Sequence, residues 1–383
     1  MYLQLGEVPT IIVSSPHMAR NSENSRPCLC VKVTNHVGKD LLHMRKIYIM
    51  ELLNAKMVKS FSPIRQDELS SLILSIKSSF GKACKDQNET MISLIHGVLS
   101  LGGGFELDDL FPSKKFLSGF SGMGPKLIEA RNKVDAVMDK VIDVHRENRA
   151  NGKKCNAEYG TNEDLIDVFF RVMETGELPF TLTNDNIKAV ILDMFVAGSD
   201  TSSSTRCMGV VEIMKNPNVM AKAQAEVREV FKGKKIFDDD DLEKLNYLKL
   251  VIKETLILHP PTPLLIPGEC GEEREIDGYI IPVKSKILVN VWAIRRDPEN
   301  SRIVRSTLVE ITSNFFHFGL GRRTCPGRLF GLALVTLPLA HLLYNFNWTL
   351  PNGMDPKDLD MTEANGMTAR RDKDLYLVPT PYI

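Results

Sequence analysis

Apolar residues recur at helical spacing over most of the chain. In residues 125–147 they lie three or four positions apart, which predicts one long helix with a single buried stripe. Pro217 predicts the start of another helix that runs to Phe231, because proline fits the first turn of a helix. The same spacing predicts further helices over residues 41–57, 66–79, 89–101, 162–173, 183–214 and 247–259.

Strand-like patterns are confined to a few places. The opening residues MYLQLGEVPTIIVSS predict two strands around Gly6 and Pro9. Residues 279–291 predict a pair of strands around a turn at 282–285, and residues 375–378 predict a late strand. Helices therefore dominate, and a small sheet is divided between the two ends of the chain. This pattern predicts a mainly α (α+β) fold.

Composition and charge exclude several classes of protein. Lysine plus arginine equals aspartate plus glutamate, 48 of each, which argues against a nucleic-acid binder. Seven scattered cysteines, an odd number in a long chain, argue against a disulfide framework. Because no run of 18 apolar residues occurs, we expect no transmembrane helix, and the start does not resemble a signal peptide.

The segment FGLGRRTCPG, residues 318–327, carries the strongest chemical signal. It places Cys325 in a loop of glycines and arginines, directly before an apolar helix over residues 328–344. The positive end of a helix favours the thiolate form of cysteine, which is the form that binds metal. A helix cap with a buried free cysteine is the alternative, but it does not account for the surrounding residues.

The spacing F-x-x-G-x-R-x-C-x-G matches the haem-binding signature of the cytochrome P-450 family. This resemblance implies a haem b cofactor with the Cys325 thiolate as axial ligand of the iron. The residues that it places around the haem on this side are Phe318, Gly319, Gly321, Arg323, Cys325, Pro326 and Gly327.

A second segment, IKAVILDMFVAGSDTSSST, combines an apolar helix with a polar stretch. Buried polar groups cost free energy unless they are paired, so the residues alone leave two interpretations open: a functional site within a helix, or a helix end capped by serines. In the resemblance, Ala197 and Gly198 begin the oxygen-binding motif of the distal helix, and Gly198 lets that helix lie close over the haem. Asp200 and Thr201 complete the motif and relay protons to bound dioxygen.

The resemblance assigns further positions less specifically. Arg45 corresponds to an arginine that contacts a haem propionate, although a surface arginine is a comparable interpretation. Core packing is the rival interpretation for the apolar residues that correspond to the substrate pocket. Those residues are Pro263, Leu264, Leu265, Gly366 and Met367. A separate set of basic residues would form a surface for an acidic reductase: Arg295, Arg296, Arg322, Arg323 and Arg328.

The amino-acid sequences of several segments resemble those of the plant A-type group of this family, which hydroxylates terpenoids, alkaloids and similar small lipophilic molecules. The resemblance implies a monooxygenase that uses O2 and electrons from an NADPH-cytochrome reductase, on the cytosolic face of the endoplasmic reticulum membrane. It further implies a single domain over residues 1–383, with the haem between the distal helix, residues 183–214, and the Cys325 loop. The start resembles the first sheet, so we expect the family's membrane anchor to be missing.

The chain departs from the family pattern in four places. Ile257 stands where the family's E-x-x-R motif has arginine, which predicts that Glu254 is a buried carboxylate without its cation, at a cost of about 3–5 kcal/mol. Gly268 replaces an arginine that contacts a propionate. The region between residues 19 and 41 is short, and a segment near residues 300–313 is missing. A catalytically impaired remnant that binds haem weakly or not at all is therefore the alternative function.

A third hypothesis comes from another class of protein. Cys325 could act as the nucleophile of a hydrolase, with His317 or His259 as its base. One cysteine and scattered histidines are a weak signal for this chemistry.

Overall fold

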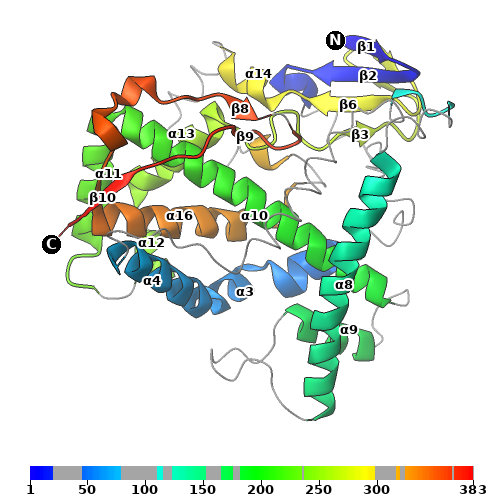
Figure 1. Ribbon diagram of the computed structural model, residues 1–383. Coiled ribbons are helices and arrows are strands. Elements are labelled where there is room, and N and C mark those ends of the chain that lie inside the picture. Colours follow the sequence, from blue (N-terminus) through cyan, green and yellow to red (C-terminus); the bar gives the residue numbers. More distant parts are fainter. Residues whose placement is uncertain are drawn as a thin grey trace.

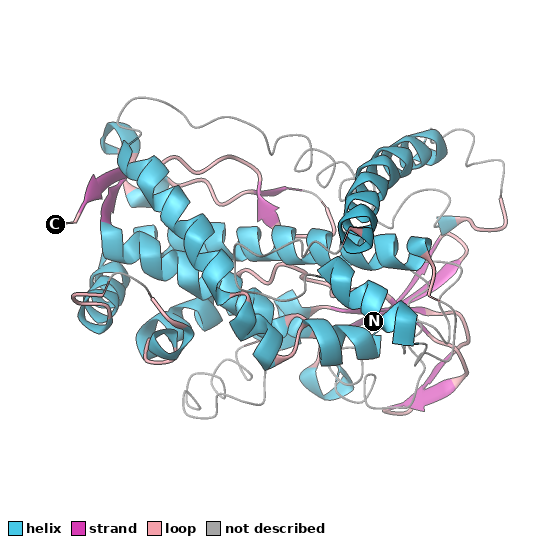
Figure 2. Ribbon diagram, turned by 90° about the horizontal axis from the view of Figure 1, so that it is seen from below, coloured by secondary structure: helices cyan, strands magenta, loops and turns pink. Residues whose placement is uncertain are grey.

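The computed structural model describes residues 1–19, 45–78, 110–114, 123–151, 165–175, 182–234, 237–297, 316–319, 324–364 and 366–382. Two long helices, α10 (Asn184–Lys215) and α16 (Arg328–Asn345), lie side by side in the middle of the molecule (Figure 1). Helices α11 (Pro217–Val230) and α13 (Asn246–Leu258) pack against both of them. The predicted dominance of helices is confirmed, and Figure 2 shows most strands toward the edges of the molecule.

The remaining helices surround this central group. Helix α8 (Met123–Ala150) contacts α9 (Leu165–Thr175) and α10. The region predicted as one helix over residues 41–57 contains a break, because Asn54 caps a new helix by accepting a hydrogen bond from the Met57 N–H at 2.9 Å. The other helical elements in the described part of the chain are a π-helix (Tyr48–Leu52), α3 (Ala55–Ser60), α4 (Ser62–Ser78), α12 (Asp239–Leu242), α14 (Val291–Arg296), and 3₁₀ turns at Phe316–Phe318, Pro351–Gly353 and Pro356–Asp358.

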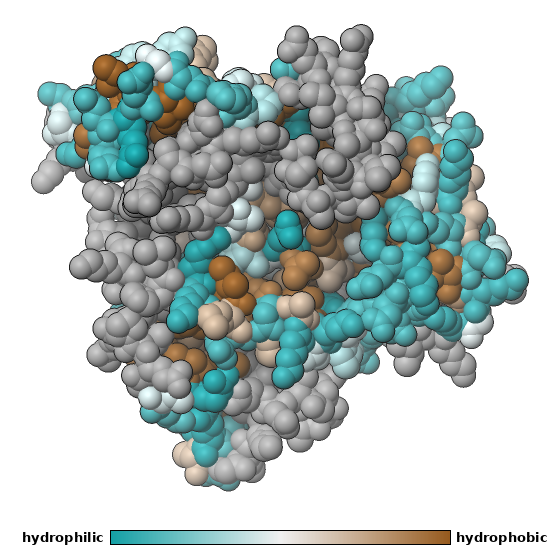
Figure 3. All heavy atoms as spheres, turned by 180° about the vertical axis from the view of Figure 1, so that it is seen from behind, coloured by the Kyte–Doolittle hydropathy of each residue, from teal (hydrophilic) through white to brown (hydrophobic). Residues whose placement is uncertain are grey.

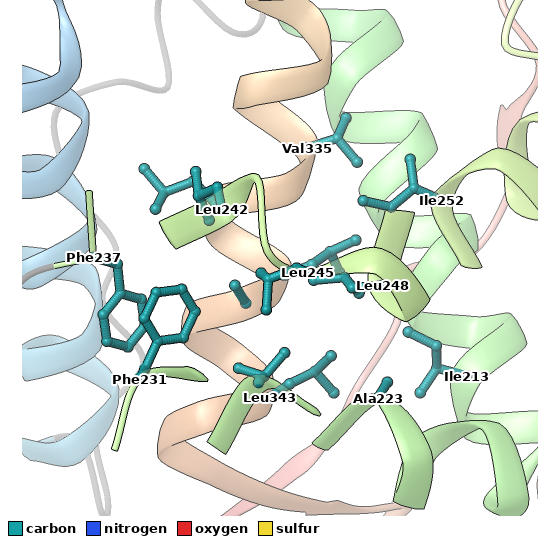
Figure 4. Close-up of a cluster of buried hydrophobic side chains, with 14 of the residues drawn as sticks. Ile213, Ala223, Phe231, Phe237, Leu242, Leu245, Leu248, Ile252, Val335 and Leu343 are labelled. Carbon is teal, nitrogen blue, oxygen red and sulfur yellow. The ribbon is translucent and has the colours of Figure 1, made fainter. Parts of the chain in front are cut away.

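The central helices are joined by an apolar core. Side chains from α10, α11, α13 and α16 meet there, and the rings of Phe231 and Phe237 stack with their centroids 3.7 Å apart (Figure 4). Leu245 and Leu248 are fully buried beside them. Complete burial of a large apolar side chain contributes roughly 1.5–3 kcal/mol, so this cluster supplies much of the force that assembles the helices.

Helices α10 and α16 also share a polar contact. Pro338 lies inside α16 and has no N–H, so the carbonyl of Leu334, four residues earlier, lacks its usual donor within the helix. Arg206 of α10 compensates, because its Nη1 lies 3.4 Å from that carbonyl oxygen. Burial lowers the pKa of the Arg206 guanidinium, as expected for a cation that is largely removed from water.

The main sheet brings the start of the chain to its later part. The two predicted strands are β1 (Tyr2–Leu5) and β2 (Val8–Val13), which pair in antiparallel fashion. Strand β2 then pairs in parallel with β6 (Lys286–Val289), which also pairs with β3 (Gly268–Glu269). The tight turn between β1 and β2 requires Gly6, because its φ is +62° and a Cβ there would lie 2.3 Å from the carbonyl oxygen of Leu110.

The other strand predictions are partly wrong. Strand β5 (Tyr279–Ile281) pairs with β4 (Arg274–Ile276) and not with β6, because β6 is already paired on both sides. The late strand is β10 (Val378–Pro381), which begins where the prediction ends and pairs with β7 (Phe346–Thr349). Strands β8 (Glu363–Ala364) and β9 (Arg370–Arg371) form another short pair. The predicted helix over residues 89–101 lies outside the described residues.

Helix α16 is long and apolar enough to cross a membrane by length and composition, although it contains no uninterrupted run of 18 apolar residues. Its contacts with α4, α10, α11 and α13 identify it as a core helix instead. Leu337, Leu339 and Ala340 are almost completely buried in these contacts.

On the face shown in Figure 3, hydrophobic and hydrophilic residues are interspersed over the described part of the surface.

The contact between Arg206 and Leu334 yields a prediction on stability. Substituting Arg206→Met leaves a carbonyl of α16 without a donor, which we expect to lower the free energy of unfolding by about 1–3 kcal/mol. In a Pro338→Ala background the helix regains its own N–H, so the same substitution should cost clearly less. Urea unfolding of the four proteins measures this coupling, and an equal cost in both backgrounds would show that Arg206 does not serve Leu334.

A second prediction concerns His341, which is buried in α16 with its ring 4.2 Å from that of Phe237. Burial lowers the pKa of His341 to about 4 from the ordinary value of 6.5. As pH falls below 6.5 the unfolded chain binds a proton that the folded chain does not, so stability should decrease by about 3 kcal/mol by pH 4. His341→Phe should remove this part of the pH dependence of unfolding, whereas His17→Phe on the exposed surface should retain it.

Candidate active site

Helix α10 continues without interruption through its polar stretch. The hydroxyl groups bond to carbonyls of the same helix: Thr201 Oγ1 donates to Ala197 at 2.6 Å, and Thr205 Oγ1 donates to Thr201 at 2.8 Å. Ser203 similarly donates to the Asp200 carbonyl at 3.0 Å. These bonds satisfy polar groups inside the protein without ending the helix. The interpretation of this segment as a helix end capped by serines is therefore wrong.

One side of α10 faces open space at the predicted oxygen-binding motif. Ala197 is exposed although it lies near the middle of a central helix. A Cβ atom placed on Gly198 would have no heavy atom within 4 Å from outside its own helix turn. Asp200, by contrast, is only 7% exposed. An apolar helix that leaves such a surface uncovered fits a bulky group that is bound there.

The Cys325 loop is held by backbone hydrogen bonds. The N–H of Cys325 donates to the carbonyl of Phe318 at 2.7 Å. Gly319, which follows, adopts a φ of +78°, where a side chain is disfavoured. Helix α16 then begins with a bond from the Gly331 N–H to the carbonyl of Gly327 at 2.7 Å. Pro326 lies between the cysteine and this first turn, and the predicted site residues Gly321 and Arg323 lie outside the described residues.

Contacts between α10 and α16 place the two predicted motifs in one region. The Ser202 hydroxyl oxygen, next to Thr201, lies 4.0 Å from the position of a Cβ on Gly331. The Cys325 sulfur lies 3.9 Å from the position of a Cβ on Gly327, one turn earlier. Leu53 packs on the same glycine at 3.8 Å. The open face of α10 and a half-buried thiol are therefore near neighbours, as a flat prosthetic group with a cysteine ligand requires.

Arg45 lies at this loop, and one of its contacts is defined. Its Nη2 donates a hydrogen bond to the carbonyl oxygen of Thr324, the residue before Cys325. The residue therefore is not the isolated surface arginine of the alternative interpretation. A guanidinium has five donors, so this contact is compatible with a further contact to a carboxylate such as a propionate.

The expected preference of Cys325 for the thiolate form is wrong for the protein alone. Burial, the largest influence, raises the pKa of the Cys325 thiol. The backbone at Gly327 and the positive charges of Arg45 and Arg328 lower it, but they do not compensate for burial. A bound metal cation reverses this balance, because a coordinated thiol loses its proton. The donor set thus fits a metal-bound sulfur better than a free nucleophile.

The two predicted substrate segments meet. The Ala369 N–H donates to the carbonyl of Pro261 at 2.8 Å, which joins the loop that contains Pro263 and Leu264 to the turn that contains Gly366 and Met367. Met367 is 39% exposed, so it is not part of the core. Leu265 is different: it packs against the sheet cluster around Val13 and Ile287, which agrees with core packing.

The structure adds a contact that the sequence patterns did not indicate. Ser204 Oγ donates to the carbonyl of Ala369 at 2.5 Å and so connects α10 to the second substrate segment. In the sequence, Ser204 was only one of three successive serines. Ser204 and Ala369 are far apart in the chain, so only the packed structure shows that they are in contact.

Two of the suspected defects have different consequences from those predicted. Glu254 is exposed on α13 and Ile257 is buried, so Glu254 is not a buried carboxylate without its cation and the predicted cost does not arise there. Gly268 is buried in β3, where it pairs with Ile287. Arg295 is only 6% exposed, so it is not part of a basic surface for a reductase. The regions between residues 19 and 41 and near residues 300–313 are almost entirely outside the described residues.

The hydrolase hypothesis finds little support. Burial is the main cause that lowers the pKa of His317 to about 3, which makes it a poor base at neutral pH. His259 lies between the carboxylates of Glu212 and Glu363 instead. The thiol of Cys325 is itself shifted away from the thiolate. Among the described residues, no group of three or more His, Cys, Asp or Glu side chains is placed to bind a metal ion.

Together these features describe a mainly helical protein in which the polar stretch of α10 and the Cys325 loop lie in one region. The family model of cytochrome P450 matches residues 71–378, so the chain belongs to the cytochrome P450 family and is a monooxygenase with a haem-iron cofactor. A zebra fish cytochrome P450 structure, solved with abiraterone, shares this fold with a TM-score of 0.75 at 18% identity. The match covers 100% of this chain and 95% of that one.

Plant enzymes are considerably more similar in sequence. Premnaspirodiene oxygenase of Hyoscyamus muticus is 49% identical over 433 residues, which cover 100% of this chain and 86% of the relative. 5-Epiaristolochene 1,3-dihydroxylase of Nicotiana tabacum is 45% identical, and tabersonine 3-oxygenase of Catharanthus roseus is 42% identical, with the same coverage. The resemblance to plant terpenoid and alkaloid oxygenases is thereby confirmed.

The environment of Cys325 yields a prediction that needs no haem. Arg45→Ala removes a positive charge that lowers the pKa of the thiol, so the pH midpoint for alkylation of Cys325 should rise. Peptide-level mass spectrometry after timed alkylation at several pH values measures this midpoint for Cys325 alone. Arg131→Ala, on the exposed side of α8, is the control and should leave the midpoint unchanged. An unchanged midpoint in the Arg45 variant would contradict the electrostatic assignment.

Proposed function

We propose that this chain hydroxylates a small lipophilic plant metabolite, a terpenoid or a similar molecule, with O2 and with electrons from NADPH through a reductase. In this proposal the Cys325 thiolate is the axial ligand of haem b. The named activities of the plant relatives, premnaspirodiene oxygenase and 5-epiaristolochene 1,3-dihydroxylase, support this class of substrate. The observation that carries the proposal is the uncovered face of α10 at Ala197 and Gly198 beside the Cys325 loop.

The residues around the haem have separate roles in this proposal. Phe318, Gly319, Pro326 and Gly327 shape the loop below the ring, together with Gly321 and Arg323 of the signature. Arg45 supports the loop through the Thr324 carbonyl. Haem, when bound, supplies the iron centre that activates O2 for insertion into a C–H bond. The protein's part is to hold the sulfur, to orient the substrate and to control water and protons.

Asp200 and Thr201 are the proposed proton-transfer residues. The Thr201 hydroxyl proton is directed to the Ala197 carbonyl, so the oxygen lone pairs remain available to accept a proton from water. Asp200, one residue earlier, is buried and supplies a carboxylate within the same helix turn. A group bound over the open face at Ala197 and Gly198 would exclude bulk water from these residues, which favours directed proton transfer.

Substrate, reductase and membrane are assigned by similarity to the family. Pro263, Leu264, Gly366 and Met367 line the substrate pocket in this proposal, and Leu265 supports the loop from the sheet side. Of the arginines expected to form a basic surface for the reductase, Arg296 and Arg328 keep this role in the proposal. We place the enzyme on the cytosolic face of the endoplasmic reticulum membrane.

A catalytically impaired remnant is the second candidate. Ile257 in place of the family's arginine and Gly268 in place of another arginine favour it. Against it, Glu254 is exposed and therefore imposes no penalty for a buried, unpaired charge. The two candidates differ in haem uptake, which can be measured directly.

The test is the reduced carbon-monoxide difference spectrum of the purified full chain. We expect the Soret band of thiolate-ligated haem in the wild type, and its loss in Cys325→Ser because a hydroxyl group is a much weaker ligand. Cys207→Ser, at a half-buried cysteine of α10 outside the site, should keep the band. A wild type without haem, or a Cys325→Ser variant with an unchanged band, would contradict the proposal.

A further inference from the structure

His259 occupies a position at which three parts of the fold meet. It follows α13 directly and precedes Pro260 and the loop that contains Pro263 and Leu264. Its Nε2 atom lies 2.9 Å from Oε1 of Glu212, which belongs to α10. Its Nδ1 atom lies 3.5 Å from Oε1 of Glu363, the first residue of β8. Helix α10 and the two substrate segments therefore converge on one imidazole ring.

The environment of this ring makes both contacts substantial. The His259 side chain is 13% exposed, and those of Glu212 and Glu363 are 24% and 36% exposed. The hydrogen bond from His259 is the main cause that lowers the pKa of the Glu212 carboxyl. The two contacts differ: Nε2 lies at hydrogen-bond distance from Glu212, whereas Nδ1 approaches the Glu363 carboxylate at 3.5 Å without meeting hydrogen-bond geometry. Charge-assisted contacts with little solvent are stronger than ordinary surface ion pairs.

Other charges near the cluster do not disrupt it. Lys215 lies near Glu212 on α10, and Arg296 of α14 lies near Glu363. Arg371 is the register partner of Glu363 across the β8–β9 pair. The cluster thus alternates in sign from α10 to β9, and His259 is the member that connects its two carboxylates.

A second polar connection runs parallel to this one. Ser204 of α10 donates to the Ala369 carbonyl, and the Ala369 N–H donates to Pro261. Ser204 and Glu212 are eight residues apart, or about 12 Å along the helix. Two separated attachments fix both the distance and the orientation of the substrate segments relative to α10, whereas a single attachment would allow rotation. The turn with Gly366 and Met367 lies between these attachments in sequence.

We propose that His259 is a positioning residue for the substrate pocket: by bridging Glu212 and Glu363, it holds the 260–265 loop and the Gly366–Met367 turn against α10. This inference rests on the proposed function, because it assigns to the bridge the choice of which carbon of a lipophilic substrate faces the oxidising centre. His259 does not itself contact the reacting atoms in this role. Its effect passes through the shape of the pocket.

The first experiment measures the bridge without requiring haem. Hydrogen exchange of the purified full chain is compared for wild type, His259→Gln, Glu363→Gln and the double variant. We expect amides in residues 361–371 to exchange about tenfold faster in each single variant, as after loss of one charge-assisted contact. Exchange in the double variant should be no faster than in the singles, because both substitutions remove the same bridge. Glu275→Gln, on the β4–β5 hairpin, is the matched control.

Two outcomes would overturn the bridge. Unchanged exchange in residues 361–371 would show that the contact holds nothing in place. Equal acceleration in α9, whose buried residues belong to a different core cluster, would indicate a general loss of stability instead. Because Glu363 is partly exposed, Glu363→Gln should fold even if His259→Gln does not, and it then decides the question by itself.

The second experiment measures the consequence for specificity. With a terpenoid substrate, His259→Gln should change the ratio of hydroxylated products while the carbon-monoxide spectrum remains that of the wild type. An unchanged product ratio together with faster exchange would overturn the role in specificity. If the wild type forms no haem-thiolate complex, the proposed function fails, whereas the exchange measurement still tests the bridge.

Discussion

The packing of α16 against α10 is the interaction on which the rest of the structure depends. The apolar stretch that follows the cysteine loop is buried among α10, α11 and α13, and this burial places Cys325 beside the uncovered part of the distal helix. Hydrophobic association is strong but not directional. The register of the two helices is therefore defined by specific features, such as the small residues Gly331 and Gly209 at the contact and the bond from Arg206 to Leu334.

That bond illustrates how a local irregularity becomes part of tertiary structure. Pro338 removes a donor from the core helix, and a cation from the neighbouring helix supplies one. Burying the Arg206 guanidinium costs free energy, as the lowered pKa indicates, but leaving a buried carbonyl without a donor also costs free energy. The result links α10, which carries one predicted site motif, to α16, which follows the other. A proline that removes a hydrogen-bond donor from one helix can thus be compensated by a buried arginine of the neighbouring helix.

The departures from the family pattern are less disruptive than the sequence suggested. The predicted penalty assumed that a carboxylate stays buried after its arginine is lost. The structure instead leaves Glu254 in solvent, where an unpaired charge costs little, and buries the apolar Ile257. Polar organisation on the other side of α13 is retained in the cluster around His259. The site is therefore supported by contacts other than the ion pairs that the family motif would provide.

The sequence by itself determined the fold class, the long helices and the resemblance of the cysteine segment to the family signature. These features depend on local spacing: three or four residues between apolar positions, and the fixed pattern from Phe318 to Gly327. It also determined the two strands at the start of the chain, whereas their antiparallel pairing through the turn at Gly6 was seen only in the structure. Only the tertiary structure decided that β6 pairs with β2 rather than β5, that Glu254 is exposed, and that Ser204 and His259 reach the substrate segments. The physical reason is that strand partners, burial and long-range contacts depend on segments far apart in the chain, whose meeting no local pattern specifies.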